Sequence, residues 1–184
     1  MNTGLLQPRI NEVFAANVGK RSLSRQRHPP RCVSAMEFYL VRHGDALSAT
    51  ENPRRPLSPE GRRRVAQTAR SARERGIQVS TIYHSGILRA AETAEILARH
   101  FPSVERVAQL SGLLPDDDPA IIKTELDLAA DSLMLVGHLP FMSRLTGLLL
   151  HGDSERPAAE FLPASMVCCV KSATEWKIRW QIAP

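Results

Sequence analysis

From residue 36 onward, the apolar residues of the chain follow two alternating spacings. Short runs rich in aromatic and β-branched residues predict β-strands, and longer stretches with apolar residues every three or four positions predict helices. The predicted strands cover 37–41, 80–84, 104–108 and 131–136, and the predicted helices cover 58–76, 87–101, 116–130 and 139–152. The last part, 161–184, is strand-rich, with MVCCV and WKIRW as its strand-forming runs.

Helix-capping residues and apolar stripes support these assignments. Ser58 and Pro59 suit the start of the helix 58–76, and Gly76 suits its end. The expected sheet-facing residues of this helix are Val65, Ala69 and Ala72. Those expected on one face of the helix 87–101 are Ile87, Ala91, Ala94, Ala98 and Phe101.

Strands that alternate with helices predict an α/β fold, here a three-layer α/β/α sandwich with a mostly parallel central sheet. No repeat and no second boundary interrupts 36–184, so this stretch is expected to form one domain. In such sheets, ligands bind beyond the carboxyl ends of the strands. Those ends are therefore the place to look for chemistry.

The formal net charge of +5 lies outside the expected domain. Residues 1–35 carry six basic residues and one acidic residue, whereas 36–184 carries 18 of each. A neutral domain argues against a nucleic-acid partner. The leader 1–35 has three interpretations: an over-extended start with Met36 as the true first residue, a disordered basic tail, or a targeting segment.

Hydropathy and cysteine content indicate where the protein works. No apolar run approaches the ~18–20 residues needed to cross a bilayer, so no membrane association is expected. The chain has three cysteines, and Cys168 and Cys169 are adjacent in a predicted strand and would face opposite sides. This pattern disfavours a disulfide framework and favours a reducing compartment. We expect a cytoplasmic monomer.

Cationic residues follow three of the predicted strands. Arg42 and His43 follow the first strand, Arg89 lies at the start of the helix after the second, and His138 follows the strand 131–136. The ends of parallel strands meet at one edge of a sheet, so these groups are expected to converge. Two arginines, two histidines and helix N-termini together suit a dianion such as a phosphoryl group.

These residues also have plainer interpretations. Arg89 lies in the first helical turn, where the macrodipole disfavours a cation by roughly 0.3–1 kcal/mol, and its plainer interpretation is an ion pair with Glu92. For Arg42 and His43 the plainer interpretation is a strand-end ion pair with Asp45. An anion bound at the strand ends would instead make use of all three cationic residues.

Metal binding is not expected. The sequence has no H-x-x-x-H or C-x-x-C spacing, and arginines at the site would repel a cation. We therefore expect neither a metal nor another cofactor.

Four segments resemble the signature segments of the histidine phosphatase superfamily, which has the phosphoglycerate mutase-like fold. They are LVRHGDA, RPLSPEG, SGILRAAETA and LVGHLPF, in this order between Met36 and about Leu150. The RHGDA form, the RPLSPEG segment, the short length and the closing W-x-x-x-W-x-x-x-P most resemble the SixA-type phosphohistidine phosphatase branch.

The resemblance implies a role for each cationic residue. His43 matches the nucleophile that accepts the phosphoryl group, Arg42 and Arg89 match the arginines that clamp it, and His138 matches the second histidine, which donates to it. This chemistry suits the residues, because phosphoryl transfer needs charge neutralisation and an in-line nucleophile. A free imidazole, with a pKa of ~6.5, is mostly neutral at pH 7.

The chain departs from the family pattern at the general acid. Many members carry a glutamate in a longer segment after the second helix, whereas this chain has the compact LSGLLPDDDPA. Asp116, Asp117 and Asp118 are candidates, as is Asp45 by proximity, and the alternative for the first three is that they only cap the next helix. An imidazole leaving group, with a pKa of ~6.5, needs less help than an alkoxide, whose conjugate acid is about as weak as water at ~15.7.

These observations predict a metal-independent phosphohistidine phosphatase. Its expected substrate is a phosphorylated signalling protein of the phosphotransfer-domain type, and its expected product is inorganic phosphate. One alternative is a small-molecule phosphomonoesterase of the same superfamily. The other is a non-catalytic module that binds phosphorylated partners.

Overall fold

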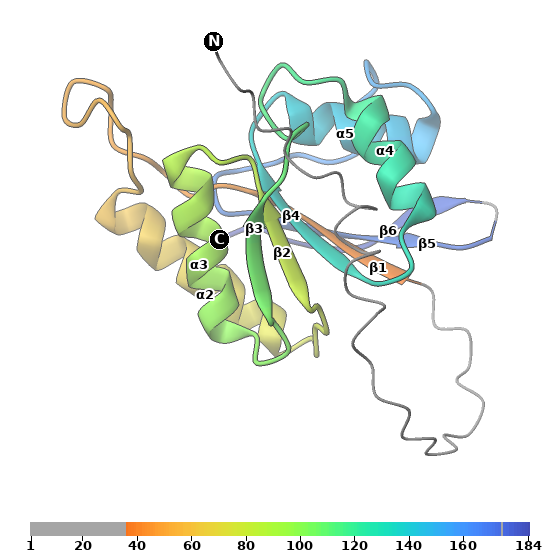
Figure 1. Cartoon of the computed structure of the whole chain (residues 1–184), viewed down its shortest axis with the longest axis horizontal. Coiled ribbons are helices and arrows are strands. Elements are labelled where there is room, and N and C mark those ends of the chain that lie inside the picture. Colours follow the sequence, from red (N-terminus) through yellow and green to blue (C-terminus); the bar gives the residue numbers. More distant parts are fainter. Residues whose placement is uncertain (1–35, 174) are drawn as a thin grey trace, which may run out of the picture.

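The computed structural model describes residues 36–173 and 175–184. The leader 1–35, with its three interpretations, and Cys32 lie outside the described residues. In the described part, a six-stranded sheet is covered by helices on both faces, which confirms the predicted α/β/α sandwich (Figure 1). No helix in this part of the chain is long and apolar enough to cross a lipid bilayer.

The sheet is mostly parallel, as predicted. Its strands are β1 (Met36–Arg42), β2 (Thr81–His84), β3 (Arg106–Gln109), β4 (Leu133–Gly137), β5 (Met166–Lys171) and β6 (Trp176–Ile182). Their spatial order is β3-β2-β4-β1-β5-β6. The first four strands in this order run parallel, and β5 and β6 are antiparallel to their neighbours. The parallel strands β1, β2 and β4 therefore end at one edge of the sheet.

The helices form two layers. They are α2 (Pro59–Arg73), α3 (Leu88–His100), α4 (Pro119–Leu128) and α5 (Phe141–His151). Helices α2 and α3 cover one face, and α4 and α5 cover the other (Figure 1). Central strand β1 serves both cores with alternate residues: Tyr39 and Val41 lie in the core under α2 and α3, and Phe38 and Leu40 lie in the opposite core.

Adjacent residues of β5 are likewise divided between the two cores, as the sequence predicted for its cysteines. Cys168 lies in the core under α2 and α3, and Cys169 lies in the core under α4 and α5. Both are buried free thiols. Burial is the main cause that raises the pKa of each to about 12, so both are neutral packing residues at physiological pH.

Helix α2 begins as predicted and ends earlier. The hydroxyl of Ser58 accepts the backbone N–H of Gly61 at 2.9 Å, and the expected stripe of Val65, Ala69 and Ala72 is buried. The helix ends at Arg73, and Gly76 lies in the turn that follows, with φ of 71°. Such a positive φ is a conformation that glycine adopts without strain.

The predicted buried face of α3 is wrong in part. Ala94 and Phe101 are buried as expected, but the other buried positions are Ala90, Thr93 and Leu97, and Ile87, Ala91 and Ala98 are only half-buried. The buried face of α3 is rotated relative to the expected one, and Thr93 occupies a core position on it. Its hydroxyl donates to the Arg89 carbonyl at 2.7 Å and accepts the Gly44 N–H at 3.2 Å. A search for apolar spacing cannot detect such a buried polar residue.

Candidate active site

The sheet edge brings the predicted cationic residues together. Arg42 pairs with Gly137 in the register of β1 and β4, and the N–H of His43 donates to the Gly137 carbonyl at 3.1 Å. His138 directly follows Gly137, and the two histidine rings lie 4.9 Å apart between centroids. Residues 95 positions apart in the sequence thus share one site, because parallel strands end side by side.

The ring of His43 is held in one tautomer. Its Nδ1 lies 2.7 Å from the carbonyl oxygen of Gly44, and a carbonyl can only accept, so Nδ1 carries the proton. The other nitrogen, Nε2, then has a free lone pair, and it accepts a hydrogen bond from Arg89 Nε at 3.1 Å. Because an imidazole attacks phosphorus through an unprotonated nitrogen, this arrangement suits a nucleophile.

Arg89 reaches His43 rather than the partner suggested by the plainer interpretation. The carboxylate of Glu92 accepts the Leu57 N–H at 2.6 Å and a hydrogen bond from Arg62 at 2.5 Å. Glu92 therefore anchors the start of the RPLSPEG segment to α3. Arg89 lies in the first turn of α3, at the edge of the sheet where the strands end.

Ser85, at the end of β2, orients His138. The hydroxyl oxygen of Ser85 lies 2.6 Å from His138 Nε2 and accepts the N–H of Ile87 at 3.3 Å. The hydroxyl oxygen has a second lone pair, so this contact fits either tautomer of His138; when Ser85 donates to Nε2, the ring proton lies on Nδ1. Nδ1 is buried and has no hydrogen-bond partner within the described part of the chain. An anion at the site would supply the missing acceptor.

Arg42 is anchored at one end of its guanidinium. Its Nη1 donates to the carbonyl of Phe161 at 2.7 Å, and its backbone N–H donates to Ser165 at 3.2 Å. Its Nε is buried and has no hydrogen-bond partner among residues 36–173 and 175–184. An unpaired buried donor costs roughly 1–3 kcal/mol. Arg42 Nε is thus a donor that a phosphoryl oxygen would satisfy, and His138 Nδ1 is a second one in the tautomer that carries its proton there.

Both histidines are neutral at physiological pH. Burial, and after it the charges of Arg89, Arg42 and Arg55, lowers the pKa of His43 to about 4, against the opposing effect of the Gly44 carbonyl. Burial is also the main cause that lowers the pKa of His138 to about 3, followed by His43, Arg89 and Arg42. This lowered pKa agrees with the expectation of a neutral imidazole at pH 7 for His43.

Two glycines of the signature segments allow the loop after β1 to pack against α2. A Cβ on Gly44 would lie 2.7 Å from a methyl group of Val65, and a Cβ on Gly61 would lie 2.1 Å from the carbonyl oxygen of Asp45. Real Cβ atoms essentially never make contacts this short. The glycines of RHG and SPEG therefore let the helix approach the loop that carries His43.

The candidate acids make their contacts away from the two histidines. Asp117 accepts the Leu114 N–H at 2.7 Å, and Asp118 caps α4 by accepting the Ala120 N–H at 2.9 Å. Asp116 is exposed. Asp45 lies 3.5 Å from a guanidinium nitrogen of Arg64. The capping interpretation is confirmed for Asp118, and a role in proton transfer for any of the four stays a prediction.

The sequence reasoning missed two residues of the site. Ser85 follows β2 immediately, the same signal that identified His43 and His138 after their strands. Arg55 is the first residue of RPLSPEG and has φ of 46°, a conformation that costs a non-glycine residue roughly 1–3 kcal/mol. Its charge contributes to the lowered pKa of both His43 and Arg89. Arg55 thus adds a third guanidinium to the positive field of the site.

Comparisons with known proteins agree with this geometry. The family model described as histidine phosphatase superfamily (branch 1) matches residues 38–113. An uncharacterized protein of Picosynechococcus sp. is 32% identical over 130 residues, which cover 65% of this chain and 76% of that protein. The mitochondrial serine/threonine-protein phosphatase PGAM5 of Mus musculus is 28% identical over 91 residues, or 49% of this chain.

The match to PGAM5 covers 32% of that protein, so this chain spans about a third of its length. Among solved structures, the protein histidine phosphatase SixA complexed with tungstate superimposes with a TM-score of 0.71. It is 23% identical, and the match covers 80% of this chain and 97% of that one. At this identity the likeness shows a shared fold.

Proposed function

The chain belongs to branch 1 of the histidine phosphatase superfamily, and we propose that it is a metal-independent phosphatase that removes phosphate from a phosphohistidine on a protein. The observation that carries the proposal is the neutral ring of His43, whose Nε2 lone pair lies 3.1 Å from a guanidinium nitrogen of Arg89. A nucleophilic nitrogen and a cationic phosphate ligand thus share one position. His138, Arg42 and Arg55 complete the site.

In the first step, the phosphoryl oxygens bind between Arg42, Arg89 and the Nδ1–H of His138. Arg89 then exchanges its hydrogen bond to His43 for one to a phosphoryl oxygen, which frees the Nε2 lone pair. Nε2 forms a bond to phosphorus while the P–N bond to the substrate breaks. The electron pair of that bond goes to the departing imidazole nitrogen. The Gly44 carbonyl, 2.7 Å from His43 Nδ1, stabilises the positive charge that develops on the ring.

In the second step, water attacks the phosphorus of phospho-His43. The P–Nε2 bond breaks, its electron pair returns to Nε2, and both protons of the water leave with the phosphate or pass to solvent. Arg42 and Arg89 neutralise the charge spread over the phosphoryl oxygens in both steps. The enzyme returns to the neutral tautomer that the Gly44 carbonyl selects.

The leaving group favours a P–N substrate. Asp117 and Asp118 already bond backbone N–H groups, and Asp45 lies beside Arg64, so these three carboxylates are engaged in other contacts. A phosphohistidine whose second ring nitrogen is protonated releases a neutral imidazole. That protonation is accessible near neutral pH because a free imidazole has a pKa of ~6.5. Such a substrate needs little help from an acid.

A second candidate function is hydrolysis of phosphoserine or phosphothreonine on a protein. The name of PGAM5, a serine/threonine-protein phosphatase, favours it. The same clamp and nucleophile would act, but one of Asp45 and Asp116–Asp118 would have to supply a proton. Replacing each of these aspartates with asparagine in turn therefore separates the two candidates.

The test is phosphate release in the presence of EDTA from three substrates in parallel. They are a histidine-phosphorylated phosphotransfer domain, a phosphoserine peptide and p-nitrophenyl phosphate. We expect fast release from the first alone, and loss of that release in His43→Gln with the fold retained. Preference for p-nitrophenyl phosphate would indicate a small-molecule phosphomonoesterase. No release from any substrate would favour a module that only binds phosphate.

A further inference from the structure

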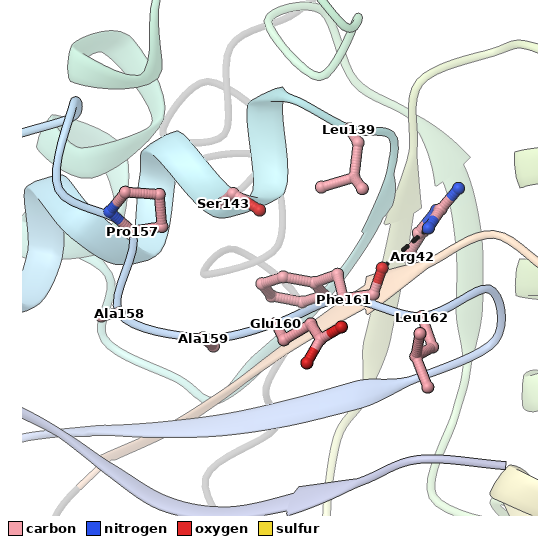
Figure 2. Close-up of a pocket in the computed structure, with 9 residues that line it drawn as sticks. All are labelled: Arg42, Leu139, Ser143, Pro157, Ala158, Ala159, Glu160, Phe161 and Leu162. Atoms are coloured by element: carbon pink, nitrogen blue, oxygen red, sulfur yellow. Dashed lines mark hydrogen bonds between the residues drawn. The ribbon is translucent and has the colours of Figure 1, made fainter.

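A largely apolar groove of about 630 Å³ begins at the phosphate site and runs away from it (Figure 2). Arg42 lies at one end. Leu139 lies just before α5 and Ser143 lies in its first turn, and these two residues form one wall. The segment 157–160 lies opposite them. Leu162 lies near the Arg42 end. None of these residues except Arg42 takes part in the proposed reaction.

Arg42 belongs both to the groove and to the proposed phosphate site. Its Nη1 donates at 2.7 Å to the carbonyl of Phe161, a residue of the groove lining, and its side chain also belongs to the phosphate site. A group attached to a phosphoryl group held by Arg42 can therefore extend along or over this groove. The natural occupant is the part of the substrate next to the phosphorylated residue.

The lining is suited to apolar side chains of a polypeptide. Leu139 is 36% exposed and Leu162 is 45% exposed, so two large apolar side chains flank the entrance to a highly charged site. The backbone of the opposite wall is partly used already, because the carbonyl of Glu160 accepts from Gln181 and that of Phe161 accepts from Arg42. Recognition by side-chain packing is thus favoured over addition of a strand.

Apolar contacts at this place would also affect the reaction. Leu139 directly follows His138, and Leu162 directly follows the residue that anchors Arg42. An apolar side chain packed against these leucines would exclude water from the mouth of the site. Charges and dipoles act more strongly when water is excluded. The groove alone is open, so the substrate protein must supply this cover.

We propose that the groove binds apolar side chains that flank the phosphohistidine on the surface of the substrate protein, and so selects protein substrates over small phosphorylated molecules. The inference rests on the proposed function and specifies its substrate class. It predicts that the enzyme acts much faster on a phosphorylated protein than on the free phosphorylated amino acid, although the bond that breaks is the same.

The experiment compares a histidine-phosphorylated phosphotransfer domain with free phosphohistidine. Leu162→Glu and Ala159→Glu each place a carboxylate in the groove, and Leu128→Glu is the matched control, since Leu128 is 64% exposed on α4 and outside the groove. We expect both groove variants to lower kcat/KM for the domain by about tenfold or more, chiefly through KM. Activity on free phosphohistidine should stay within about twofold of wild type, and the control should leave both substrates unaffected.

Each other outcome is decisive. A wild type that cleaves neither substrate rejects the proposed function and this inference with it. Equal wild-type kcat/KM for the two substrates, or groove variants that act normally on the domain, would overturn the groove alone and leave the phosphatase standing. If Leu162→Glu weakens activity on both substrates, the result for Ala159→Glu decides. Loss of activity of Ala159→Glu on the domain alone supports the groove as a substrate-binding site, and loss on both substrates rejects it.

Discussion

Replacing Arg89 with methionine should raise the pKa of His43. In the intact site, Arg89 Nε donates to His43 Nε2 at 3.1 Å. Burial comes first among the causes that lower the pKa of His43 to about 4, and the charges of Arg89 and Arg42 follow. Protonation of Nε2 therefore breaks a hydrogen bond and places two cations side by side. Methionine removes the charge and the donor and keeps a long side chain that is compatible with a helix.

The expected rise in the pKa of His43 follows from the total lowering of that pKa and from the share that Arg89 contributes. The interval from 6.5 to about 4 corresponds to about 3 kcal/mol at 1.36 kcal/mol per pKa unit. Two full charges 4 Å apart interact by about 4 kcal/mol at an effective dielectric constant of about 20. The guanidinium charge is delocalised and the site opens to solvent, so roughly 1–2 kcal/mol is expected from Arg89. The pKa of His43 should rise by roughly one unit and stay below 6.5, because burial persists.

The assay is a pH titration of protein labelled with ¹⁵N in its histidine rings. The His43 signal is assigned by its loss in His43→Gln. Arg99→Met is the matched control, because Arg99 lies on the same helix, is exposed and pairs with Glu95. A wild-type His43 that titrates near 6.5, or an Arg89→Met protein with an unchanged pKa at His43, would refute the reasoning.

Three further predictions concern the supports of the site. Ser85→Ala should lower kcat by roughly two- to tenfold, because the hydrogen bond that orients His138 is worth roughly 0.5–1.5 kcal/mol. The ¹⁵N spectrum of His138 should show a changed balance of tautomers, and an unchanged spectrum would contradict this. Gly61→Ala should lower the free energy of unfolding by roughly 1–3 kcal/mol in urea denaturation, because the new Cβ would lie 2.1 Å from the Asp45 carbonyl. Wild-type stability in this variant would show that the contact is not tight. Lowering the pH from 6.5 to about 4 should reduce the free energy of unfolding by up to about 3 kcal/mol through His43, because the unfolded chain binds more protons in this window. His43→Gln should show a smaller loss in the same urea titrations, and an equal loss would assign the effect to other groups.

The fold could be predicted because most elements carry one of two regular spacings. Strand β1 reads as a continuous apolar run because both of its faces are buried, and α2 shows its capping serine and its alanine stripe directly in the sequence. Helix α3 was less predictable, because Thr93 takes a core position and is satisfied by the backbone of Arg89 and Gly44. Whether a polar residue can be buried depends on partners that only the tertiary structure supplies.

The convergence of the site was predictable for a topological reason. Parallel strands must end at one edge, so a cationic residue after each of several strands implies a shared pocket even though the intervals between them are long. Partners within the pocket were less predictable. The role of Ser85 depends on a contact of 2.6 Å with His138, and the influence of Arg55 depends on how the loop before α2 folds back. Neither contact has a spacing that a sequence pattern can reveal.

Within the part of the chain that the structure describes, the site contains partly buried cations and unpaired polar atoms, and both cost free energy that a bound anion would offset. Burial lowers the pKa of Arg42 and of Arg89, so the charged form of each is less strongly favoured here than in water. Arg42 Nε and His138 Nδ1 are buried and have no hydrogen-bond partner in the described part of the chain. A phosphoryl group relieves both costs at once, and its charge is greatest on the oxygens that these donors would contact. These groups would thus contribute binding energy to a phosphoryl group, while burial and the same positive field keep His43 neutral, as the proposed attack on phosphorus requires.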